Sequence, residues 1–348
     1  MSDRTAPNRV APSPRRRIPE ESGIFAVLVV VALGLSLISP SFRTVSNGFV
    51  LLVNGAVIMF LALGQSFVLL TGGIDLSTGA NIAMTGVIAA LLMRFGLPWP
   101  IASVLALAAA TLLGVVNGAL THFLKIPAFI ATFSTQGVAL AIPLIITGAQ
   151  SISVHDFGFT WIGQGRVLGL PTPVALVIIA AVAAGFFLRM TRLGVHIYAL
   201  GGNRAAARLS GVNVATTTLF VYGVSGFCAG VGGLIATSRL MVGFPATGTG
   251  NELFYSIAAA VVGGVSLFGG VGTIQGAIIG AVLIAVVSNG MNVINVQSYW
   301  QSLVIGVIIL LGVTFDTYRR SRSGKPALRR NAPATVAALK PKPPSPTG

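Results

Sequence analysis

The hydrophobic positions of this chain gather in long apolar runs that are separated by short polar or Gly/Pro-containing segments. A helix rises about 1.5 Å per residue, so about 20 apolar residues are needed to cross the hydrocarbon core of a bilayer. Measured with this length, the pattern predicts ten spans, with approximate limits at 22–39, 48–70, 78–95, 99–121, 128–148, 172–190, 215–237, 252–268, 275–292 and 299–316. The third and the eighth are short enough to be tilted, broken or re-entrant.

Composition agrees with this pattern. Of 348 residues, 54% are hydrophobic and 8% are charged, whereas about a quarter of the residues in a soluble domain are charged. Because 7 acidic residues cannot cover a soluble globule, most of the apolar surface must face lipid. We therefore predict an all-α, polytopic membrane protein with its transmembrane permease domain at 22–316. The tails 1–21 and 317–348 are rich in Pro, Arg, Ala and Ser and are predicted to be disordered.

Basic residues predict the orientation, because Lys and Arg are retained on the cytoplasmic side of a membrane. The 22 Lys and Arg residues concentrate in both tails and in the loop at 189–208. A cytoplasmic N-terminus puts eighteen of them inside and leaves four outside, at Arg43, Arg94, Arg166 and Arg239. Both termini are therefore predicted to be cytoplasmic, which requires an even number of spans. This orientation signal explains the net charge of +15 better than nucleic-acid binding does.

Residues that usually carry catalysis are sparse. The single cysteine, Cys228, allows neither an intrachain disulfide nor a cysteine-based metal site. The histidines at 122, 155 and 196 fall in predicted loops and form no H-E-x-x-H motif. The sequence also lacks a G-x-x-x-x-G-K-[ST] phosphate loop. We predict that the chain is not an enzyme and holds no metal or cofactor, so that any ATP and Mg²⁺ bind to a separate chain.

Polar residues inside the apolar runs are candidates for a solute pathway. Amides and hydroxyls can bond a neutral polyhydroxylated solute, although the same groups also join helices. Asp75 could cap the following helix, contact a substrate or ion, or pack helices together. Glu252, at the outer mouth, is interpreted first as a solvated acid at the start of a helix. The pathway candidates are Gln65, Asp75, Asn81, Asn117, Asn289 and Asn292.

The segment 199–212, with the sequence ALGGNRAAARLSGV, is predicted to form a short helix on the cytoplasmic face. Asn203 can cap this helix, the alanines favour it and Gly211 can end it. Such a helix fits a groove on a partner protein, and an ordinary positive-inside loop is the alternative. The candidate residues for contact with this partner are Gly201, Gly202, Asn203, Arg204, Ala207, Arg208 and Gly211.

A possible internal repeat links two glycine-rich segments. The residues from Gly72 to Gly79 follow the pattern G-G-I-x-L-x-x-G, and those from Gly263 to Gly270 follow the pattern G-G-V-x-L-x-x-G. In so glycine-rich a chain, an accidental match is the alternative. The predicted topology puts both copies on the inner side, which does not fit an inverted five-plus-five repeat.

Three segments resemble the permease subunit of bacterial ABC importers for monosaccharides of the ribose, xylose, arabinose and galactoside group. They are TGGIDLSTG at 71–79, YALGGNRAAARLSGV at 198–212 and IAAAVVGGVSLFGGVGTIQGAIIG at 257–280. The likeness extends over roughly residues 45 to 316. It implies a homodimer in the bacterial inner membrane, a cytoplasmic ABC ATPase that binds ATP and Mg²⁺, and a periplasmic sugar-binding protein.

The same resemblance implies that the loop from Gly201 to Gly211 is the coupling element for the ATPase. One departure lies near the outer mouth. Family members usually have E-L-D-A-I-A-A where this chain has E-L-F-Y-S-I-A-A, beginning at Glu252. The familiar Asp is missing and one residue is added.

These observations predict the permease subunit of an ABC importer that moves a monosaccharide of the ribose or xylose kind across the inner membrane. One alternative is an ABC permease for another polar solute, such as a nucleoside or a branched-chain amino acid. The other is an ion-coupled secondary transporter that uses Asp75 or Glu252. The sequence does not indicate which solute is carried.

Overall fold

The computed structural model of this chain describes residues 21–322. The tails predicted to be disordered, 1–21 and 317–348, lie outside the described residues except for their innermost positions. Within 21–322 the secondary structure is almost entirely helical, and the strands are each two residues long. The predicted all-α class is therefore confirmed.

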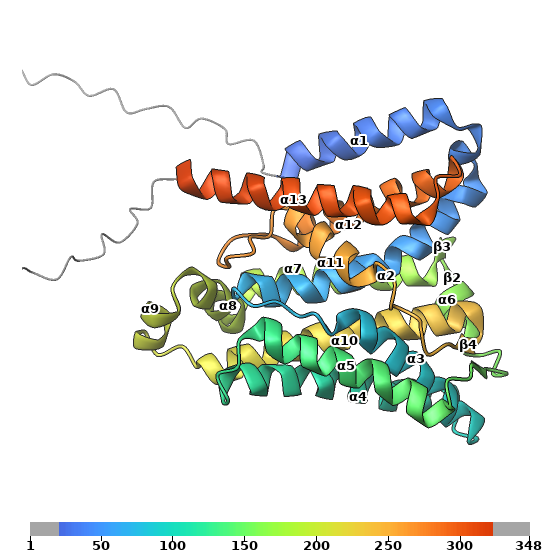
Figure 1. The fold of residues 1–348 in the computed structure, drawn as a ribbon, viewed down its shortest axis with the longest axis horizontal. Helices are drawn as coiled ribbons and strands as arrows, with labels where there is room; N and C mark the ends of the chain where they lie inside the picture. Colours follow the sequence, from blue (N-terminus) through green and yellow to red (C-terminus); the bar gives the residue numbers. More distant parts are fainter. Residues whose placement is uncertain (1–20, 323–348) are drawn as a thin grey trace, which may run out of the picture.

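Apolar helices form the bundle (Figure 1). Within the described residues, seven helices are long and apolar enough to cross a membrane. They are α2 (Val45–Leu70), α4 (Trp99–His122), α5 (Ala128–Thr147), α7 (Thr172–Met190), α10 (Val214–Leu240), α12 (Ile274–Val293) and α13 (Ser298–Arg322). Three apolar helices are shorter: α1 (Glu21–Ile38), α3 (Thr78–Arg94) and α11 (Glu252–Val262). Together they correspond to the ten predicted spans.

Eight of these ten helices begin and end within three residues of the predicted limits. The last helix continues to Arg322, beyond the predicted end at 316. The prediction for the eighth span, 252–268, was wrong, because α11 ends at Val262. The glycine at 264 has a φ of 88°, a left-handed conformation that ends a helix.

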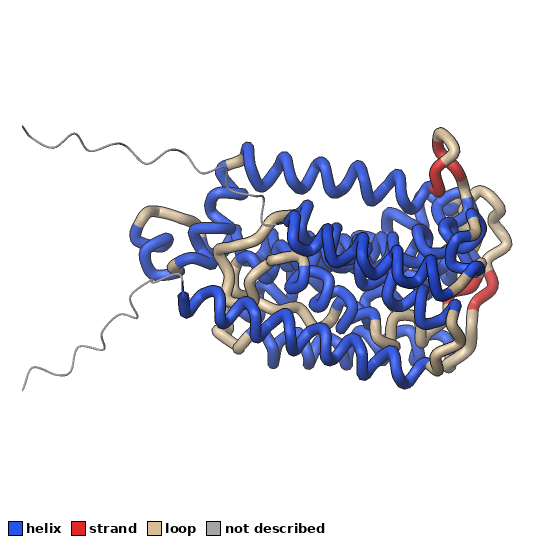
Figure 2. The backbone as a smooth tube through the Cα atoms, turned by 90° about the horizontal axis from the view of Figure 1, so that it is seen from above, coloured by secondary structure: helices blue, strands red, loops and turns tan. Residues whose placement is uncertain are grey.

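Short elements cover the two ends of the bundle. At one end lie α8 (Arg192–Gly202) and α9 (Arg204–Leu209), and at the other lie the strands (Figures 1 and 2). The other short elements are η1 (Pro40–Arg43), β1 (Ile152–Ser153), α6 (Thr160–Gln164), β2 (Arg166–Val167), β3 (Leu170–Pro171) and β4 (Val242–Gly243). The antiparallel pair β1–β4 places Ile152 opposite Gly243, and the pair β2–β3 places Arg166 opposite Pro171.

Helix α1 begins and α13 ends at the same end of the bundle as α8 and α9 (Figure 1). Both ends of the described chain therefore lie on one side, as an even number of spans requires.

Helix α10 lies at the centre and packs closely on α4. A side chain at Gly114 would overlap the carbonyl oxygen of Tyr222, and one at Gly226 would overlap that of Ala110. Small residues at such contacts are typical of helix packing in membranes. The outer surface is apolar, with exposed side chains at Leu112, Phe133, Ile179 and Leu311, as expected for helices that face lipid.

Candidate functional site

Helices α2 and α11 end in the same way. In each, a glycine with a positive φ follows the last cap residue: Gly72, with a φ of 76°, and Gly264, with a φ of 88°. In both turns the amide of this glycine donates to the carbonyl three residues back, and the next amide donates to the carbonyl five residues back. The predicted repeat aligned Gly72 with Gly263, so the structural equivalence lies one residue later than the sequence match.

The two breaks touch each other at the α8–α9 end of the bundle. The amide of Gly270, in the segment between α11 and α12, donates to the carbonyl oxygen of Leu70 over 2.9 Å. Gly201 of α8 packs directly against both segments and leaves no room for a side chain. A Cβ atom there would overlap the Leu70 oxygen and lie 2.5 Å from the Gly270 nitrogen. We call this set, consisting of Leu70, Gly72, Gly201, Gly269 and Gly270, the glycine junction. It attaches α8 directly to both helix breaks.

Tyr198 adds a second attachment of α8. Its hydroxyl donates to the carbonyl oxygen of Gly272 over 2.9 Å. Burial raises the pKa of the Tyr198 phenol, so the side chain stays protonated and remains a donor at neutral pH. Helix α8 is thus attached to the segment 263–273 through a side chain as well as through the backbone.

Helix α9 has the form that the sequence predicted. The side-chain oxygen of Asn203 accepts hydrogen bonds from the amides of Ala205 and Ala206 at 3.1 and 3.0 Å, which is an N-cap. After α9 the chain turns at Gly211, whose φ is 81°. Ala207 is buried, whereas the side chains of Arg204, Arg208 and Leu209 are exposed. The helix therefore presents two cations and one apolar side chain outward.

A cavity of about 1150 Å³ lies beside α9. Its lining includes three cationic side chains, Lys125, Arg204 and Arg208, together with His122, and none of the lining residues is acidic. The electrostatic potential at this end of the bundle is therefore positive, which favours an acidic partner surface.

Asp75 lies fully buried in the non-helical segment after the first break. One carboxylate oxygen accepts from the amide and the hydroxyl of Ser77 at 3.0 and 2.7 Å, and the other accepts from Ser225 of α10 at 2.7 Å. The N-cap of α3 is Ser77, and Asp75 accepts from no amide of the first helical turn. The cap interpretation of Asp75 is therefore wrong, and its bonds join the helix break to α10.

Asn117 extends this network. Its amide donates to the hydroxyl of Ser77 over 2.9 Å and accepts from Thr135 of α5. Asn81 donates to carbonyl oxygens of α4 and α10. Gln65 is fully buried and forms no hydrogen bond among the described residues. These three predicted pathway residues, together with Asp75, lie between packed helices.

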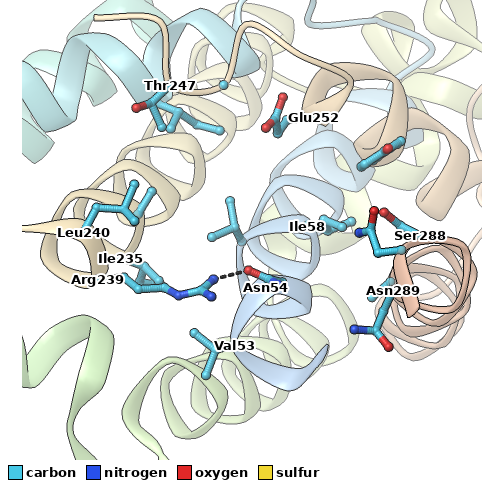
Figure 3. A pocket seen from close by; sticks show the side chains of 17 residues that line it. Val53, Asn54, Ile58, Ile235, Arg239, Leu240, Thr247, Glu252, Ser288 and Asn289 are labelled. Atoms are coloured by element: carbon cyan, nitrogen blue, oxygen red, sulfur yellow. Dashed lines mark hydrogen bonds between the residues drawn. The ribbon is translucent and has the colours of Figure 1, made fainter. Parts of the chain in front are cut away.

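The remaining candidates line a second cavity, of about 290 Å³, between α2, α10, α11 and α12. We call it the polar cavity (Figure 3). The structure brings Glu252, Asn289 and Asn292 together here. Sequence reasoning missed the other polar residues of the lining, which are Asn54, Arg239, Thr247, Tyr255 and Ser288. Asn54 and Ser288 stand out as polar positions in apolar helices, but only the fold brings them close to Arg239.

Most polar groups of this cavity have protein partners. Arg239 donates to the side-chain oxygen of Asn54 (Figure 3). The amides of Asn289 and Asn47 bond each other reciprocally at 2.9 and 3.0 Å. Asn292 accepts from Gln301 over 2.6 Å. These bonds hold the side chains at fixed positions around the cavity.

Glu252 differs from its neighbours. It is half-buried in the first turn of α11, and its Oε2 atom is buried without a hydrogen-bond partner in the described residues. Leaving such an acceptor unpaired costs about 1–3 kcal/mol, and more for a charged group. The prediction of a simply solvated acid was therefore wrong for this oxygen, although the place of Glu252 at the start of a helix is confirmed.

The described residues include no group of three or more His, Cys, Asp or Glu side chains that could hold a metal ion.

Comparison with known proteins gives consistent matches over most of the chain. The family model for "Branched-chain amino acid transport system / permease component" matches residues 47–313. The chain is 40% identical to the ribose import permease protein RbsC of Escherichia coli K12 over 308 residues, which is 86% of this chain and 94% of that protein.

Two further relatives are named after other sugars. The chain is 36% identical to the D-allose transport system permease protein AlsC of Escherichia coli K12 over 299 residues, or 85% of this chain and 91% of that protein. It is 34% identical to the L-arabinose ABC transporter permease protein AraH of Azospirillum brasilense over 334 residues, or 92% of this chain and 98% of that protein. No solved structure matches the chain.

Proposed function

The chain belongs to the permease family described as the branched-chain amino acid transport system / permease component, and from this membership we propose that it is the membrane-spanning subunit of an ABC importer for a monosaccharide. The solute class comes from the relatives, whose names specify ribose, D-allose and L-arabinose. The observation that carries the mechanism is the glycine junction, which attaches an exposed basic helix pair to two breaks in the bundle.

In this proposal the α8–α9 end and both termini face the cytoplasm of a bacterium, and the strand end faces the periplasm. The positive-inside rule supports this orientation, because Arg189, Arg192, Arg204 and Arg208 all lie in or beside α8 and α9. A periplasmic sugar-binding protein delivers the solute at the strand end. Two copies of the chain form a homodimer in the inner membrane.

The energy comes from a separate cytoplasmic ABC ATPase that binds ATP and Mg²⁺. Its acidic surface contacts α9, where Arg204 and Arg208 are exposed. Closure of the ATPase displaces α9 and, through Gly201, displaces both helix breaks together. A coupled shift of α2–α3 and α11–α12 then exposes the pathway to alternate sides of the membrane.

Solute uptake by cells tests this function. Cells that lack their own permeases for ribose, allose and arabinose receive this chain together with its ATPase and binding protein. We expect accumulation of D-ribose, D-allose or L-arabinose, with no competition from a tenfold excess of L-leucine or a nucleoside. Uptake of labelled L-leucine or of a labelled nucleoside, without sugar uptake, would instead support another polar solute as the cargo.

Asp75 distinguishes this proposal from ion-coupled transport. We expect Asp75→Asn to keep uptake within about twofold of the unmodified chain, because an amide can accept from Ser77 and donate to Ser225. Asp75→Leu leaves several buried polar groups unpaired and should lower the free energy of unfolding by about 3 kcal/mol. Thermal unfolding in detergent and uptake in cells measure the two effects. A folded Asp75→Asn variant without any uptake would contradict the structural role and favour a proton or sodium site.

A further inference from the structure

We propose that the polar cavity is a monosaccharide-binding site that lies inside a single copy of the chain, in the half of the bundle nearer to the strands. This inference rests on the proposed function, because it takes a sugar as the cargo. It goes further by naming the residues that hold the sugar and by giving each copy of the chain a site of its own.

The size of the cavity fits one sugar ring. Its volume of about 290 Å³ lies at the lower end of the range for small-molecule pockets, about 300–1,000 Å³. A single sugar ring therefore has room in the cavity.

The charges of the cavity are arranged for hydroxyl groups. Glu252 and Arg239 lie on opposite sides of the cavity (Figure 3). The carboxylate of Glu252 lines the cavity, and the guanidinium keeps further N–H donors besides the one that bonds Asn54. A sugar hydroxyl both donates and accepts, so neighbouring hydroxyls on one ring can meet both groups. Because the two charges balance, a neutral solute leaves neither of them uncompensated.

Tyr255 supplies an apolar surface in the same cavity. It lies one helical turn after Glu252, on the same face of α11, and is 8% exposed. Its hydroxyl is 3.5 Å from the side-chain oxygen of Gln301, which leaves the ring to pack against the C–H face of a sugar. This tyrosine belongs to the E-L-F-Y-S-I-A-A segment, where the sequence departs from the usual family pattern. The departure therefore falls on a residue of the proposed binding site.

Glu252 and Arg239 could also hold the ammonium and carboxylate groups of an amino acid. The lining combines amide and hydroxyl groups, at Asn54, Thr247, Ser288, Asn289 and Asn292, with the apolar side chains of Val53, Val57, Ile58, Ile82, Ile235 and Leu240. The amides and hydroxyls favour a sugar, whereas the apolar side chains would accommodate the side chain of an amino acid. An amino acid such as leucine is therefore the competing ligand in the test.

Protection of an introduced thiol tests the site. The only native cysteine, Cys228, is 3% exposed, so Ser288→Cys places a single reactive thiol in the cavity. The chain is reconstituted with its ATPase and binding protein, and a methanethiosulfonate reagent is added with whichever of D-ribose, D-allose and L-arabinose the uptake assay identifies as cargo. At a sugar concentration of about ten times Kd, labelling should slow about tenfold, because only unoccupied sites react.

Two controls accompany this measurement. Ser302→Cys lies outside the polar cavity, and its labelling should not depend on sugar. In Ser288→Cys combined with Glu252→Gln, the half-protecting sugar concentration should rise about tenfold, because the amide lacks the charge that strengthens the hydrogen bond. Asp156→Asn, a matched loss of a carboxylate outside the cavity, should leave that concentration unchanged.

The result also separates this inference from the function on which it rests. Sugar uptake with unprotected labelling of Ser288→Cys overturns the cavity site and leaves the permease function intact. Protection by L-leucine but not by the sugar overturns it as well. If none of the three sugars is taken up, the proposed function fails, and the inference fails with it. Protection by the cargo sugar, weakened by Glu252→Gln, supports the site.

Discussion

Replacing Gly201 with alanine should abolish sugar uptake and lower the free energy of unfolding by about 3 kcal/mol, at the upper end of the usual cost of overpacking. The added methyl group would overlap the carbonyl oxygen of Leu70 and lie 2.5 Å from the Gly270 nitrogen. Both neighbours are backbone atoms, so neither can move aside by a change of rotamer. Helix α8 must then separate from both helix breaks. Thermal unfolding of the purified chain and uptake in cells measure the two losses.

The adjacent glycine provides a matched control. A Cβ atom at Gly202 would meet no atom within 4 Å, so Gly202→Ala should leave unfolding and uptake unchanged. Equal behaviour of Gly201→Ala and Gly202→Ala would show that the glycine junction does not hold α8 as described.

Reversing the charge at Arg204 should remove the ATPase from the purified complex and reduce uptake to background. Arg204 is exposed on α9, and a like charge facing an acidic partner surface costs about 3 kcal/mol or more, which corresponds to at least about a hundredfold weaker binding. Because the side chain is exposed, Arg204→Glu should not change the unfolding temperature of the chain. Co-purification of the ATPase and uptake in cells are the measurements.

Arg94→Glu serves as the control, because it makes the same change of charge at an exposed residue at the end of α3, beside strand β1. It should leave ATPase binding unchanged. Unaltered ATPase binding and uptake in Arg204→Glu would rule out α9 as the contact for the ATPase.

Much of the fold could be predicted because membrane spans are specified by length and apolarity, both of which are local properties. The short helix α9 was equally predictable, since its cap, Asn203, and its final turn, at Gly211, are encoded within a few residues. The early end of α11 was not predictable by the same rule. Gly263 and Gly264 lie in an apolar run, where glycines also serve helix packing.

The candidate site was only partly predictable, because its contacts join distant parts of the chain. Asp75 was noticed from its sequence context, but its partner Ser225 is 150 residues away. Asn289 and Asn292 were proposed as pathway residues, whereas Arg239 was counted only as an outer charge. Four helices must pack before Arg239 and Glu252 face each other across one cavity. Amides that join helices and amides that line a cavity have the same sequence pattern.

Helices α2 and α11 end in the same kind of turn, and the segments after the two turns share one contact with α8. Gly72 and Gly264 have φ values of 76° and 88°, and the segments that follow them are bonded to each other through Gly270 and Leu70. One rigid element, α8, contacts both segments through Gly201. A single displacement from outside can therefore move two parts of the bundle together, which a packed interior permits as a discrete shift.

Whether a separate ATPase powers this chain can be decided by reconstitution into liposomes. Labelled D-ribose, D-allose and L-arabinose are offered to vesicles that contain the chain by itself and to vesicles that also contain its ATPase, its binding protein and ATP. We expect one of these sugars to accumulate above its external concentration only in the complete vesicles. Accumulation against a gradient by the chain alone would contradict the proposal that this protein is a gate driven by a second molecule.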